Sequence, residues 1–511
     1  MFLDSNQALD NGAHLEADVC IVGAGAAGIT LALELQSSGL SVLLLESGGF
    51  TMDDNTQQLY SGDGGAGVAD IGLTTCRARV LGGSTHWWAG WCRMLDPDVF
   101  EVRDWMPYSG WPIDRAALMP FYQRAHQTLQ LGVPEYDVHA LSEALGRTLL
   151  TLDETLAAHL VYQYSTPMVR FGHHFRSDLE SSEAIDVLLF ANLTEIVLTE
   201  QGDAVSRLEC ATLMGRTFSV SADRIVLAMG GVETPRILLA SNRQEPDGIG
   251  NAFGHVGRFF MEHPHYYSGS VLVVDEARDT ALYEQTMAAR MSSPVEGAPA
   301  REVHVRAALG LSADQRRRAQ LMGLAATLKP FNPANPAGRA EQLAAETVGQ
   351  LLSAGMSQAN QRYLALDLRC EQRPHPDSRI TLTDDRDALG VPRVRLRWLV
   401  TDEDRDSVAR TLKRLAAALG VGMSARLWMP LDEADLYHPV NTQGGCHHMG
   451  TARMSALPED GVVDSHGKVH GIANLYLAGS AVFPTGGFAN PTTTIVALAH
   501  RLADHLKEKT P

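Results

Sequence analysis

The chain has 511 residues, of which 45% are hydrophobic and 20% are charged, and its formal net charge at pH 7 is −18. This length allows a large core and two or three domains, and the composition is ordinary for a globular protein. The acidic balance argues against nucleic acid or an anionic membrane surface as a partner.

The N-terminal residues show no secretion signal, because they lack both a basic region and a long apolar core. No stretch approaches the roughly 18 consecutive apolar residues that a membrane-spanning helix needs. The six cysteines are scattered and form no Cys-x-x-Cys pair, so we expect free thiols and neither disulfides nor a metal site. We therefore expect a cytoplasmic enzyme, and we expect residues 1–16 to form a loose polar arm.

Residues 18–46 predict a dinucleotide-binding unit of strand, helix and strand. The apolar run 19–22 is followed by Gly23, Gly25 and Gly28 at the spacing G-x-G-x-x-G. Gly23 permits a tight turn, Gly25 lets a pyrophosphate approach the backbone, and Gly28 lets the helix pack closely on the strand.

The ligand contacts expected of this unit lie at its helix and at its second strand. The helix N-terminus, which includes Ala26 and Ala27, offers free N–H groups and a partial positive charge to a phosphate. The second strand, 42–45, ends at Glu46, whose carboxylate can accept hydrogen bonds from an adenosine ribose. Because this fingerprint does not separate FAD from NAD, the cofactor must be decided by later stretches.

Residues 77–92, RARVLGGSTHWWAGWC, follow a Gly- and Asp-rich segment, 47–72, that predicts an irregular loop. Gly82, Gly83 and Ser84 form a second turn of small residues that a cofactor can approach closely. The aromatic residues that follow form either a packed loop or a wall of the flavin and substrate pocket. The gathering of three tryptophans beside a glycine turn favours the pocket. These aromatic residues are His86, Trp87, Trp88 and Trp91.

The middle of the chain returns to helix and strand patterns. Asp114 predicts the N-cap of a helix whose apolar face carries Leu118, Tyr122 and Leu129. Apolar, β-branched stretches between residues 185 and 230 predict further strands of the nucleotide-binding sheet. Two histidine pairs could suggest a metal, but we interpret them as surface or loop histidines because no matching ligand spacing accompanies them. They are His173 with His174 and His263 with His265.

Residues 270–435 predict a second, substrate-covering domain with an antiparallel sheet. Alternating apolar residues at 363–370 and 394–398 indicate half-buried strands. A helix is expected to begin after Thr401 and to end at Gly420. Further helices are expected at 312–323 and 341–355, with Arg316, Arg317 and Arg318 on a solvated helix face.

The C-terminal stretch carries residues suited to alcohol chemistry. His447 or His448 could take a hydroxyl proton. The alternative interpretation of either is a loop histidine that forms structural hydrogen bonds and has no catalytic role. Asn490 and Pro491 predict the start of a long helix. The Asn490 side chain could cap this helix and could face the flavin and hold a substrate hydroxyl, and the two roles can coexist.

Two further features suit this end of the chain to a cofactor. A predicted strand, 475–478, ends at Gly479 and Ser480, at the edge where parallel sheets bind cofactors. The N–H groups of Thr492 and Thr493, together with the helix dipole, would stabilise negative charge on a flavin.

The chain resembles the glucose–methanol–choline (GMC) oxidoreductase family over about two thirds of its length. The motifs that carry the resemblance are, in order, GAGAAG, RVLGGS, LAMGGVETPRILL, GRFFMEH, HHMGTARM and VFPTGGFANPTTTI. The resemblance implies FAD and oxidation of an alcohol by hydride transfer to flavin N5. It also implies that His447 of the H-x-x-G-T motif is the catalytic base and that Asn490 is its partner. By the same matching, the backbone at Leu193 contacts the adenine.

Within this family, the chain looks nearest to bacterial pyranose and glycoside oxidoreductases. The STHW segment resembles the sequence in which pyranose 2-oxidases attach FAD to a histidine. Here His86 stands one position earlier than that histidine and Trp87 takes its place, so we expect non-covalent FAD. Gly479 stands where many relatives have Asp, and Ser480 is expected to supply the missing hydrogen bond.

We therefore predict an α/β fold, α+β in its whole composition. A Rossmann-like FAD-binding domain is interleaved with a substrate domain built on an antiparallel sheet with helices. The predicted segments are 1–109, 183–268 and 436–511 for FAD binding, 110–182 as a substrate or cap segment, and 269–435 for substrate binding.

The predicted reaction is FAD-dependent oxidation of a CH–OH group on a sugar, glycoside or polyol. Tailoring of a secondary-metabolite alcohol or lactol, and non-catalytic dinucleotide binding, are the alternatives. Oxygen, a quinone or a carrier protein is the expected electron acceptor. The predicted catalytic residues are His447 and Asn490. The predicted cofactor-binding residues are Gly23, Gly25, Ala26, Ala27, Gly28, Glu46, Ser47, Arg79, Gly82, Gly83, Ser84, His86, Trp88, Ala89, Leu193, Gly230, Gly479, Ser480, Pro491 and Thr492.

Overall fold

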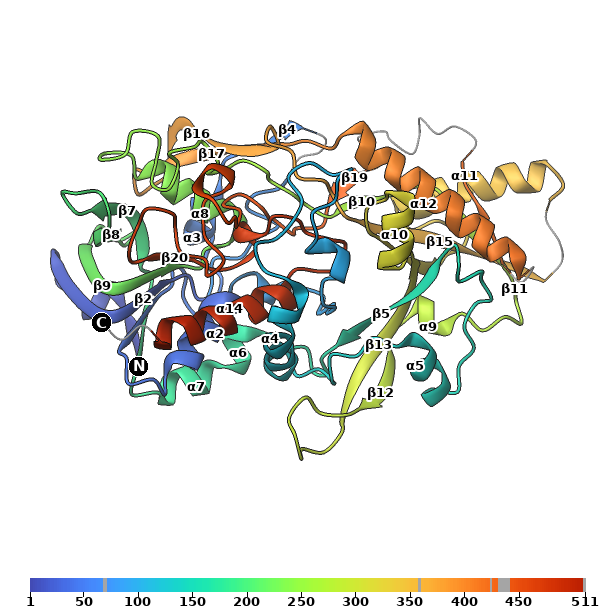
Figure 1. The fold of residues 1–511 in the computed structure, drawn as a ribbon, viewed down its shortest axis with the longest axis horizontal. Coiled ribbons are helices and arrows are strands. Elements are labelled where there is room, and N and C mark those ends of the chain that lie inside the picture. The colour runs from blue at the N-terminus through green and yellow to red at the C-terminus, as the bar shows by residue number, and fades with distance from the viewer. Residues whose placement is uncertain (68–70, 357–359, 423–424, 431–441, 509–511) are drawn as a thin grey trace.

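Figure 1 shows the computed structural model of the chain, which describes residues 1–67, 71–356, 360–422, 425–430 and 442–508. A mostly parallel sheet with its helices lies toward one end of the long axis, and an antiparallel sheet with its helices lies toward the other. Segments from the beginning, middle and end of the chain meet in the first part. The predicted mixed α/β fold, with a Rossmann-like sheet and a separate antiparallel sheet, is confirmed.

The mostly parallel sheet has eight strands in the described residues. Seven follow in the order β1 (Phe2–Asp4), β6 (Ile185–Leu189), β3 (Val42–Leu45), β2 (Ala13–Val22), β9 (Thr217–Leu227), β8 (Val205–Ala211) and β7 (Asn192–Leu198), and β20 (Leu475–Leu477) also pairs with β9. The pairs that β8 forms with β9 and β7 are antiparallel, and the other pairs are parallel. The carboxyl ends of β2, β3, β9 and β20 therefore meet at one edge.

Helices bury the central strands of this sheet. All four residues of β3 and the last four of β2 are buried, which explains their continuous apolar runs. Helix α2 (Ala26–Leu35) packs against α14 (Thr492–Glu508), which also packs against α4 (Arg115–Thr128). The predicted cap of α4 is confirmed, because Asp114 accepts a hydrogen bond from the N–H of Ala117 at 2.8 Å.

Two predictions of irregular structure near the N-terminus are wrong. Strand β1 pairs with β6, and α1 (Ser5–Ala8) follows it, so residues 1–16 are not a loose arm. Segment 47–72 contains α3 (Asp54–Gln57), the 3₁₀ turn η1 (Gln58–Tyr60) and β4 (Asp63–Gly67). Pairing with distant strands and capping by local side chains satisfy the backbone of these polar stretches, and composition does not reveal such partners.

The antiparallel sheet has nine strands in the part of the chain that the structure describes. Its main path is β12 (Met287–Met291), β13 (Arg301–Gly310), β14 (Leu324–Pro330), β15 (Gln361–Cys370), β10 (Pro264–Tyr266) and β19 (Thr442–Gly444). Off this path are β5 (Ala158–Tyr164), which pairs with β13, β11 (Val271–Asp275), which pairs with β15, and β18 (Ala425–Trp428), which pairs with β11. As the alternation predicts, Leu364, Leu366, Leu368 and Cys370 of β15 are buried.

The helices of this part are α10 (Ala313–Ala319), α11 (Arg339–Ser353) and α12 (Asp402–Val421). Thr401 caps α12 as predicted, but the helix continues through Gly420 to Val421. Arg316 of α10 is fully buried, so the prediction of a solvated arginine face is wrong for this residue. Its Nε donates to Asp98 at 2.7 Å and its Nη2 to Asp96 at 2.9 Å.

The alternation at 394–398 identifies a strand correctly but assigns it to the wrong sheet. That strand, β17 (Pro392–Trp398), pairs with β16 (Arg379–Arg386) and with β4 in a separate three-stranded sheet. Helix α8 (Gly230–Ala240) packs against β16 and β17. Periodicity therefore shows that one face of a strand is buried, but not which neighbours bury it.

The predicted domain boundaries stay predictions. Segment 110–182 contributes α4 to the parallel-sheet part and β5 to the antiparallel sheet. The boundary predicted between residues 435 and 436 lies outside the described residues. The remaining short helices are α5 (Val138–Ala144), α6 (Phe171–His174), α7 (Arg176–Ser181) and α9 (Ala281–Glu284). None of the described helices combines the length and apolar character needed to cross a membrane.

Candidate active site

A cavity of about 480 Å³ opens at the carboxyl edge of the parallel sheet. It extends from the N-terminus of α2 past the start of α8 to the N-terminus of α14. This volume lies within the range of small-molecule and cofactor sites. The predicted cofactor-binding residues on its wall are Gly23, Gly25, Ala26, Ala27, Glu46, Ser47, Arg79, Gly83, Ser84, Trp88, Ala89, Leu193, Gly230, Gly479, Ser480, Pro491 and Thr492.

The first glycine turn has the geometry that a pyrophosphate requires. Gly23 has φ +103°, and a Cβ there would lie 2.8 Å from the carbonyl oxygen of Ala228. A Cβ on Gly28 would lie 1.9 Å from the carbonyl oxygen of Gly23, so Gly28 serves packing and lies off the cavity wall. A Cβ on Gly25 would meet no heavy atom within 4 Å. No side chain caps α2 at Gly25, which leaves the first N–H groups of α2 for a phosphate.

Glu46 ends β3 on the cavity wall and is buried. Its Oε2 accepts from the N–H of Ala24 at 2.9 Å and its Oε1 from the N–H of Gly48 at 2.8 Å. Burial raises the pKa of Glu46, and these backbone contacts oppose the rise. A carboxylate has about four lone-pair positions, and with the further backbone contact of Ser47 one remains for a ribose hydroxyl.

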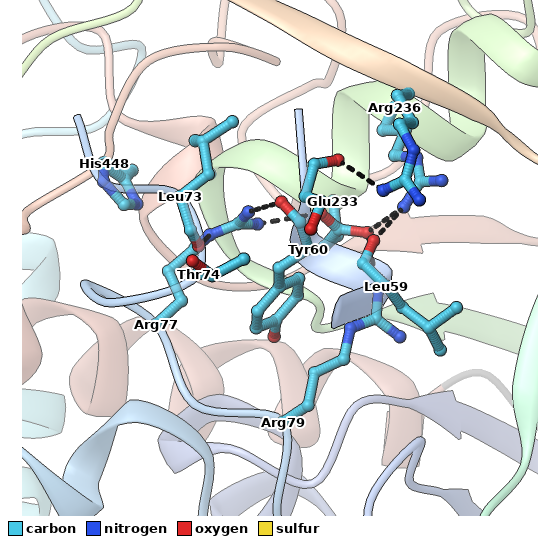
Figure 2. Close-up of polar contacts among 12 residues, drawn as sticks. Leu59, Tyr60, Leu73, Thr74, Arg77, Arg79, Glu233, Arg236 and His448 are labelled. Atoms are coloured by element: carbon cyan, nitrogen blue, oxygen red, sulfur yellow. Dashed lines mark hydrogen bonds and ion pairs between the residues drawn. The ribbon is translucent and has the colours of Figure 1, made fainter. Parts of the chain in front are cut away.

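A buried ion cluster builds the wall between the glycine turn and α8 (Figure 2). Glu233 of α8 accepts from Arg77 at 2.8 Å, from Arg79 at 2.7 Å and from Arg236 at 3.0 Å. Although burial alone would raise the pKa of Glu233, the three guanidinium charges lower it to about 2. The guanidinium groups of Arg77 and Arg79 also lie over the ring of Tyr60, at 3.9 and 4.3 Å from its centroid.

The cluster leaves a surplus of positive charge beside the cavity. Arg236 pairs with Asp387 at 2.6 Å, so three arginines face two carboxylates. Arg79 also donates to Ser47 at 2.6 Å. A positive wall next to a helix N-terminus suits an anionic dinucleotide. Sequence analysis found Arg79 but missed Arg77, Glu233 and Arg236, although the i,i+3 spacing of the last two in a helical pattern is a signal for an ion pair.

His86 and Gly82 do not reach the cavity wall, contrary to prediction. Nε2 of His86 lies 2.8 Å from the carbonyl oxygen of Leu81. His86 ends the 3₁₀ turn η2 (Gly83–His86). Ser84 and Trp87 on either side of it line the cavity, and Trp87 stays 44% exposed.

At the other end of the cavity, His447 and Asn490 form a pair. Nδ2 of Asn490 donates to Nε2 of His447 at 3.1 Å, so in this arrangement Nε2 is unprotonated. The His447 proton then lies on Nδ1, which is 2.9 Å from Nδ1 of His263. Helix α14 begins at Thr492, and the buried Oδ1 of Asn490 has no partner in the described residues. The N-cap interpretation of Asn490 is therefore wrong, and its amide faces the histidine.

Three residues missed by sequence analysis support His447. Oε2 of Glu262 accepts from the N–H of His447 at 2.9 Å and from the N–H of His263 at 3.2 Å. His263 is buried, and His265 lies on β10 and lines the cavity. The loop interpretation is wrong for His265, which lies on β10, whereas His263 precedes the strand, and the pairing of β10 with β19 brings both to the 445–448 turn. The run EHPH directly after GRFFM was the available signal.

The two neighbouring histidines have different electrostatic environments. Burial and the charges of His263, His265 and Arg369 lower the pKa of His447 well below its ordinary value, so it is neutral at pH 7. Nε2 of His448 lies 3.2 Å from Oε1 of Glu262, and the charges of Cys76 and Glu262 raise the pKa of His448 against the effect of burial. Of the two histidines, His447 is the one in contact with Asn490. Ser480 donates to the carbonyl oxygen of His448 at 2.7 Å and so holds this turn.

Comparison with known families gives two matches. The model described as GMC oxidoreductase matches residues 374–499, and the model described as FAD dependent oxidoreductase matches residues 18–247. Together they cover the C-terminal stretch with His447 and Asn490 and the N-terminal stretch with the first glycine turn.

Several curated proteins are similar over much of their length. Paromamine 6'-oxidase from Streptomyces fradiae is 27% identical over 95% of this chain and 90% of its own. The 2-methyl-1,2-propanediol dehydrogenase of Mycolicibacterium austroafricanum is 23% identical over 97% of this chain and 96% of its own. C-glycoside 3-oxidase from Microbacterium trichothecenolyticum is 27% identical over 62% of this chain and 53% of its own.

Solved structures share the fold. Formate oxidase has a TM-score of 0.58 at 16% identity, covering 98% of this chain and 99% of its own. Pyridoxine 4-oxidase from Mesorbium loti has a TM-score of 0.55 at 17% identity, covering 97% of this chain and 100% of its own.

Proposed function

The chain belongs to the GMC oxidoreductase family, an FAD-dependent group that acts on CH–OH donors, and we propose that it oxidises an alcohol group of a sugar, glycoside or polyol. The observation that carries this proposal is the contact of His447 Nε2 with Asn490 Nδ2 at 3.1 Å, inside the cavity that also contains the first glycine turn.

The residues of the cavity fit FAD. The N–H groups at the start of α2 and the surplus charge at Arg79 and Arg236 would hold the pyrophosphate, and Glu46 would hold the ribose. The N–H groups at the start of α14, near Thr492, would stabilise negative charge at the reacting end. The position of His86 off the wall supports non-covalent binding. FAD, when bound, accepts the hydride that leaves the alcohol carbon.

The protein groups carry the proton part of the reaction. Nε2 of neutral His447 accepts the proton of the substrate hydroxyl, and Nδ2 of Asn490 donates a hydrogen bond to the developing alkoxide. The imidazolium then has its Nδ1 proton held by Nδ1 of His263 at 2.9 Å. Burial above all keeps His447 unprotonated before substrate binds, and the charge of Arg369 acts in the same direction, which leaves the base ready.

The wall of the cavity and the relatives support the proposed substrate class. Trp87 offers an exposed apolar face, while His265 and Arg369 offer polar groups on the same wall, and Arg369 lies over the ring of Trp91 at 3.9 Å. Stacking surfaces with few polar contacts suit a ring that bears hydroxyl groups. The names of the curated relatives include a paromamine oxidase and C-glycoside 3-oxidases. Tailoring of a hydrophobic secondary-metabolite alcohol or lactol is the second candidate, and the exposed face of Trp87 favours it.

A substrate panel distinguishes these candidates. Free sugars, glycosides, polyols and hydrophobic alcohols are mixed with the enzyme under anaerobic conditions, and bleaching of the flavin absorbance is followed. Fast bleaching by sugars or glycosides supports the first candidate, and bleaching by hydrophobic alcohols alone supports the second. Acid precipitation of the same enzyme should release the flavin into the supernatant, as non-covalent binding requires.

The role of His447 has a direct test. His447→Ala should slow anaerobic bleaching by about 10² to 10⁴ fold, the usual contribution of a general base, with the flavin still bound. His174→Ala is the matched control, because His174 is an exposed histidine of α6 outside the cavity. An undiminished rate of flavin bleaching in His447→Ala would contradict the proposed role of His447.

A further inference from the structure

Two cysteines that are distant in sequence meet on the cavity wall. Cys76 precedes the second glycine turn, Cys446 precedes His447, and both line the cavity. Their side chains are hydrogen-bonded to each other. Cys446 is the exposed member of the pair. The other four cysteines are buried and free: Cys20, Cys92, Cys210 and Cys370.

An imidazole and a carboxylate stand behind Cys76. Its Sγ lies 3.6 Å from Nε2 of His448, and the same nitrogen lies 3.2 Å from Oε1 of Glu262. Arg77 adds a second positive charge, and the nearest further thiol is Cys446 itself. A thiolate next to imidazolium and guanidinium groups is stabilised, and reactive cysteines are found in such partly exposed, electropositive places.

These contacts make the two thiols chemically different. The hydrogen bond from Cys446, with the charges of His448 and Arg77, lowers the pKa of Cys76 to about 4 against the effect of burial. The contact with Cys76, and then burial, raises the pKa of Cys446. Cys76 is therefore a thiolate at neutral pH, while Cys446 keeps its proton.

We propose that Cys76 is a peroxide-reactive thiolate and that Cys446 is the thiol that resolves it into a disulfide. The Cys76 thiolate attacks one oxygen of hydrogen peroxide, the O–O bond breaks, the sulfur becomes a sulfenic acid, and hydroxide leaves. The Cys446 sulfur then attacks the sulfenic sulfur. The S–S bond forms, the S–O bond breaks, and the Cys446 proton leaves with the hydroxide as water. Hydrogen peroxide is the two-electron oxidant and ends as water.

The disulfide would change the surroundings of His447. It removes the thiolate charge that helps to hold a proton on His448, and it ties Cys446, whose φ is +59°, to the loop of Cys76. His447 is the next residue, and its N–H is held by Glu262. We therefore expect oxidation to slow turnover and dithiothreitol to restore it. This consequence rests on the proposed role of His447, whereas the thiol chemistry does not.

Peptide mapping of the FAD-loaded enzyme tests the proposal without an assay of turnover. The enzyme is treated with hydrogen peroxide, the remaining thiols are blocked with iodoacetamide, and the protein is digested without reductant. The expected product is a pair of peptides joined through Cys76 and Cys446 that dithiothreitol separates. The four buried cysteines serve as internal controls and should appear only as alkylated thiols after unfolding. Recovery of both Cys76 and Cys446 as alkylated, unoxidised thiols from peroxide-treated enzyme overturns the proposal.

The Cys446→Ser variant isolates the first step, and the exposed position of Cys446 makes this change mild. In this variant peroxide should leave a sulfenic acid on Cys76 that dimedone labels, whereas Cys76→Ser should give neither label nor crosslink. The rate at which iodoacetamide alkylates Cys76 should change less than about twofold between pH 7 and pH 5. The rate for free glutathione, whose thiol loses its thiolate form over this range, should fall about 100-fold. An alkylation rate that falls with glutathione, or peroxide-treated Cys446→Ser without the label, contradicts the assignment.

Discussion

At the scale of single residues, His263 decides where the proton of His447 lies. The two Nδ1 atoms are 2.9 Å apart, and Asn490 already donates to the other nitrogen of His447. His263 must then accept, which fixes His447 as the tautomer whose Nε2 faces the substrate. His263 is a positioning residue in this account, because it acts through His447 and does not touch the reacting atoms.

Replacing His263 should therefore lower turnover more than substrate binding. His263→Ala removes the acceptor and should reduce kcat by about 10²-fold with a smaller change in KM, since a misplaced proton disables a general base. His263→Asn places a carbonyl oxygen near the lost Nδ1 and should recover much of the loss. Steady-state kinetics of both variants check this, with circular dichroism as the control for folding. Equal losses in the two variants would point to a packing role instead.

The same residues show what the sequence can and cannot predict about the site. His447 and Asn490 are identified by motifs within the last 76 residues of the chain, where local pattern is informative. Glu262 and His263 act through contacts that span 185 and 184 positions in sequence, and only the pairing of β10 with β19 makes those contacts. The sequence also allowed the Asn490 side chain to serve as cap and in the site together, because both roles need the same residue type before Pro491.

At the scale of elements, helix α8 positions the arginines of the cavity wall through a single carboxylate, that of Glu233. Glu233 contacts three arginines from two segments, and all four side chains are almost completely buried. Removing one member of such a cluster leaves uncompensated buried charge, which costs far more than the loss of a surface pair. Helix α8 thus fixes the arginines beside the first glycine turn.

Glu233→Gln should destabilise the protein by about 3–5 kcal/mol and lower its FAD content on purification. Glu209→Gln is the matched control, because Glu209 pairs with Arg207 on the surface with side chains 36% and 42% exposed. The control should cost less than about 1 kcal/mol. Urea unfolding followed by tryptophan fluorescence, with flavin absorbance measured in parallel, compares the two variants. Similar midpoints for both would contradict the role of the cluster.

Elements with local signals were predictable, and elements with distant partners were not. The starts of α4 and α12 follow from Asp114 and Thr401, which cap their own helices. Strand β17 was identified by its alternation, but its partner β4 lies more than 300 positions earlier. Arg316 looked exposed because its ion-pair partners, Asp96 and Asp98, lie in a different segment of the chain.

At the scale of the whole molecule, the two sheets meet at the cavity through short connections. Strand β19 of the antiparallel sheet leads within three residues to His447, and β20 of the parallel sheet is followed by the segment that leads to Asn490. The catalytic pair thus combines one residue positioned by each sheet. This explains why fold class could be predicted from strand patterns, while the closeness of the pair rested on the family resemblance.

The buried histidines predict how the whole molecule responds to acid. Burial lowers the pKa of His126, His159 and His263 to about 4, of His265 to about 3, and of His447 well below its ordinary value. Below about pH 6.5 these histidines bind protons in the unfolded chain but stay neutral in the folded chain. The free energy of unfolding therefore falls as the pH falls toward 4. Burial has the opposite effect on three acids, since it raises the pKa of Glu46, of Glu262 to about 7 and of Asp404 to about 6.

Burial also lowers the pKa of His470 and His500, so seven histidines stand against three acids, and this leaves a net loss of stability on acidification between pH 6.5 and 4.5. Each unmatched proton contributes about 1.4 kcal/mol per pH unit, so the thermal midpoint should drop steeply across this window. His126→Gln should reduce the slope of stability against pH by the contribution of about one proton. His126 is suited to this test because it is fully buried and lies outside the cavity. Thermal melts of both proteins at half-unit pH steps, at constant ionic strength, measure the two slopes. A midpoint that is flat or rises between pH 6.5 and 4.5 would mean that these imidazoles admit protons in the folded state, and the neutral form assigned to His447 would be wrong.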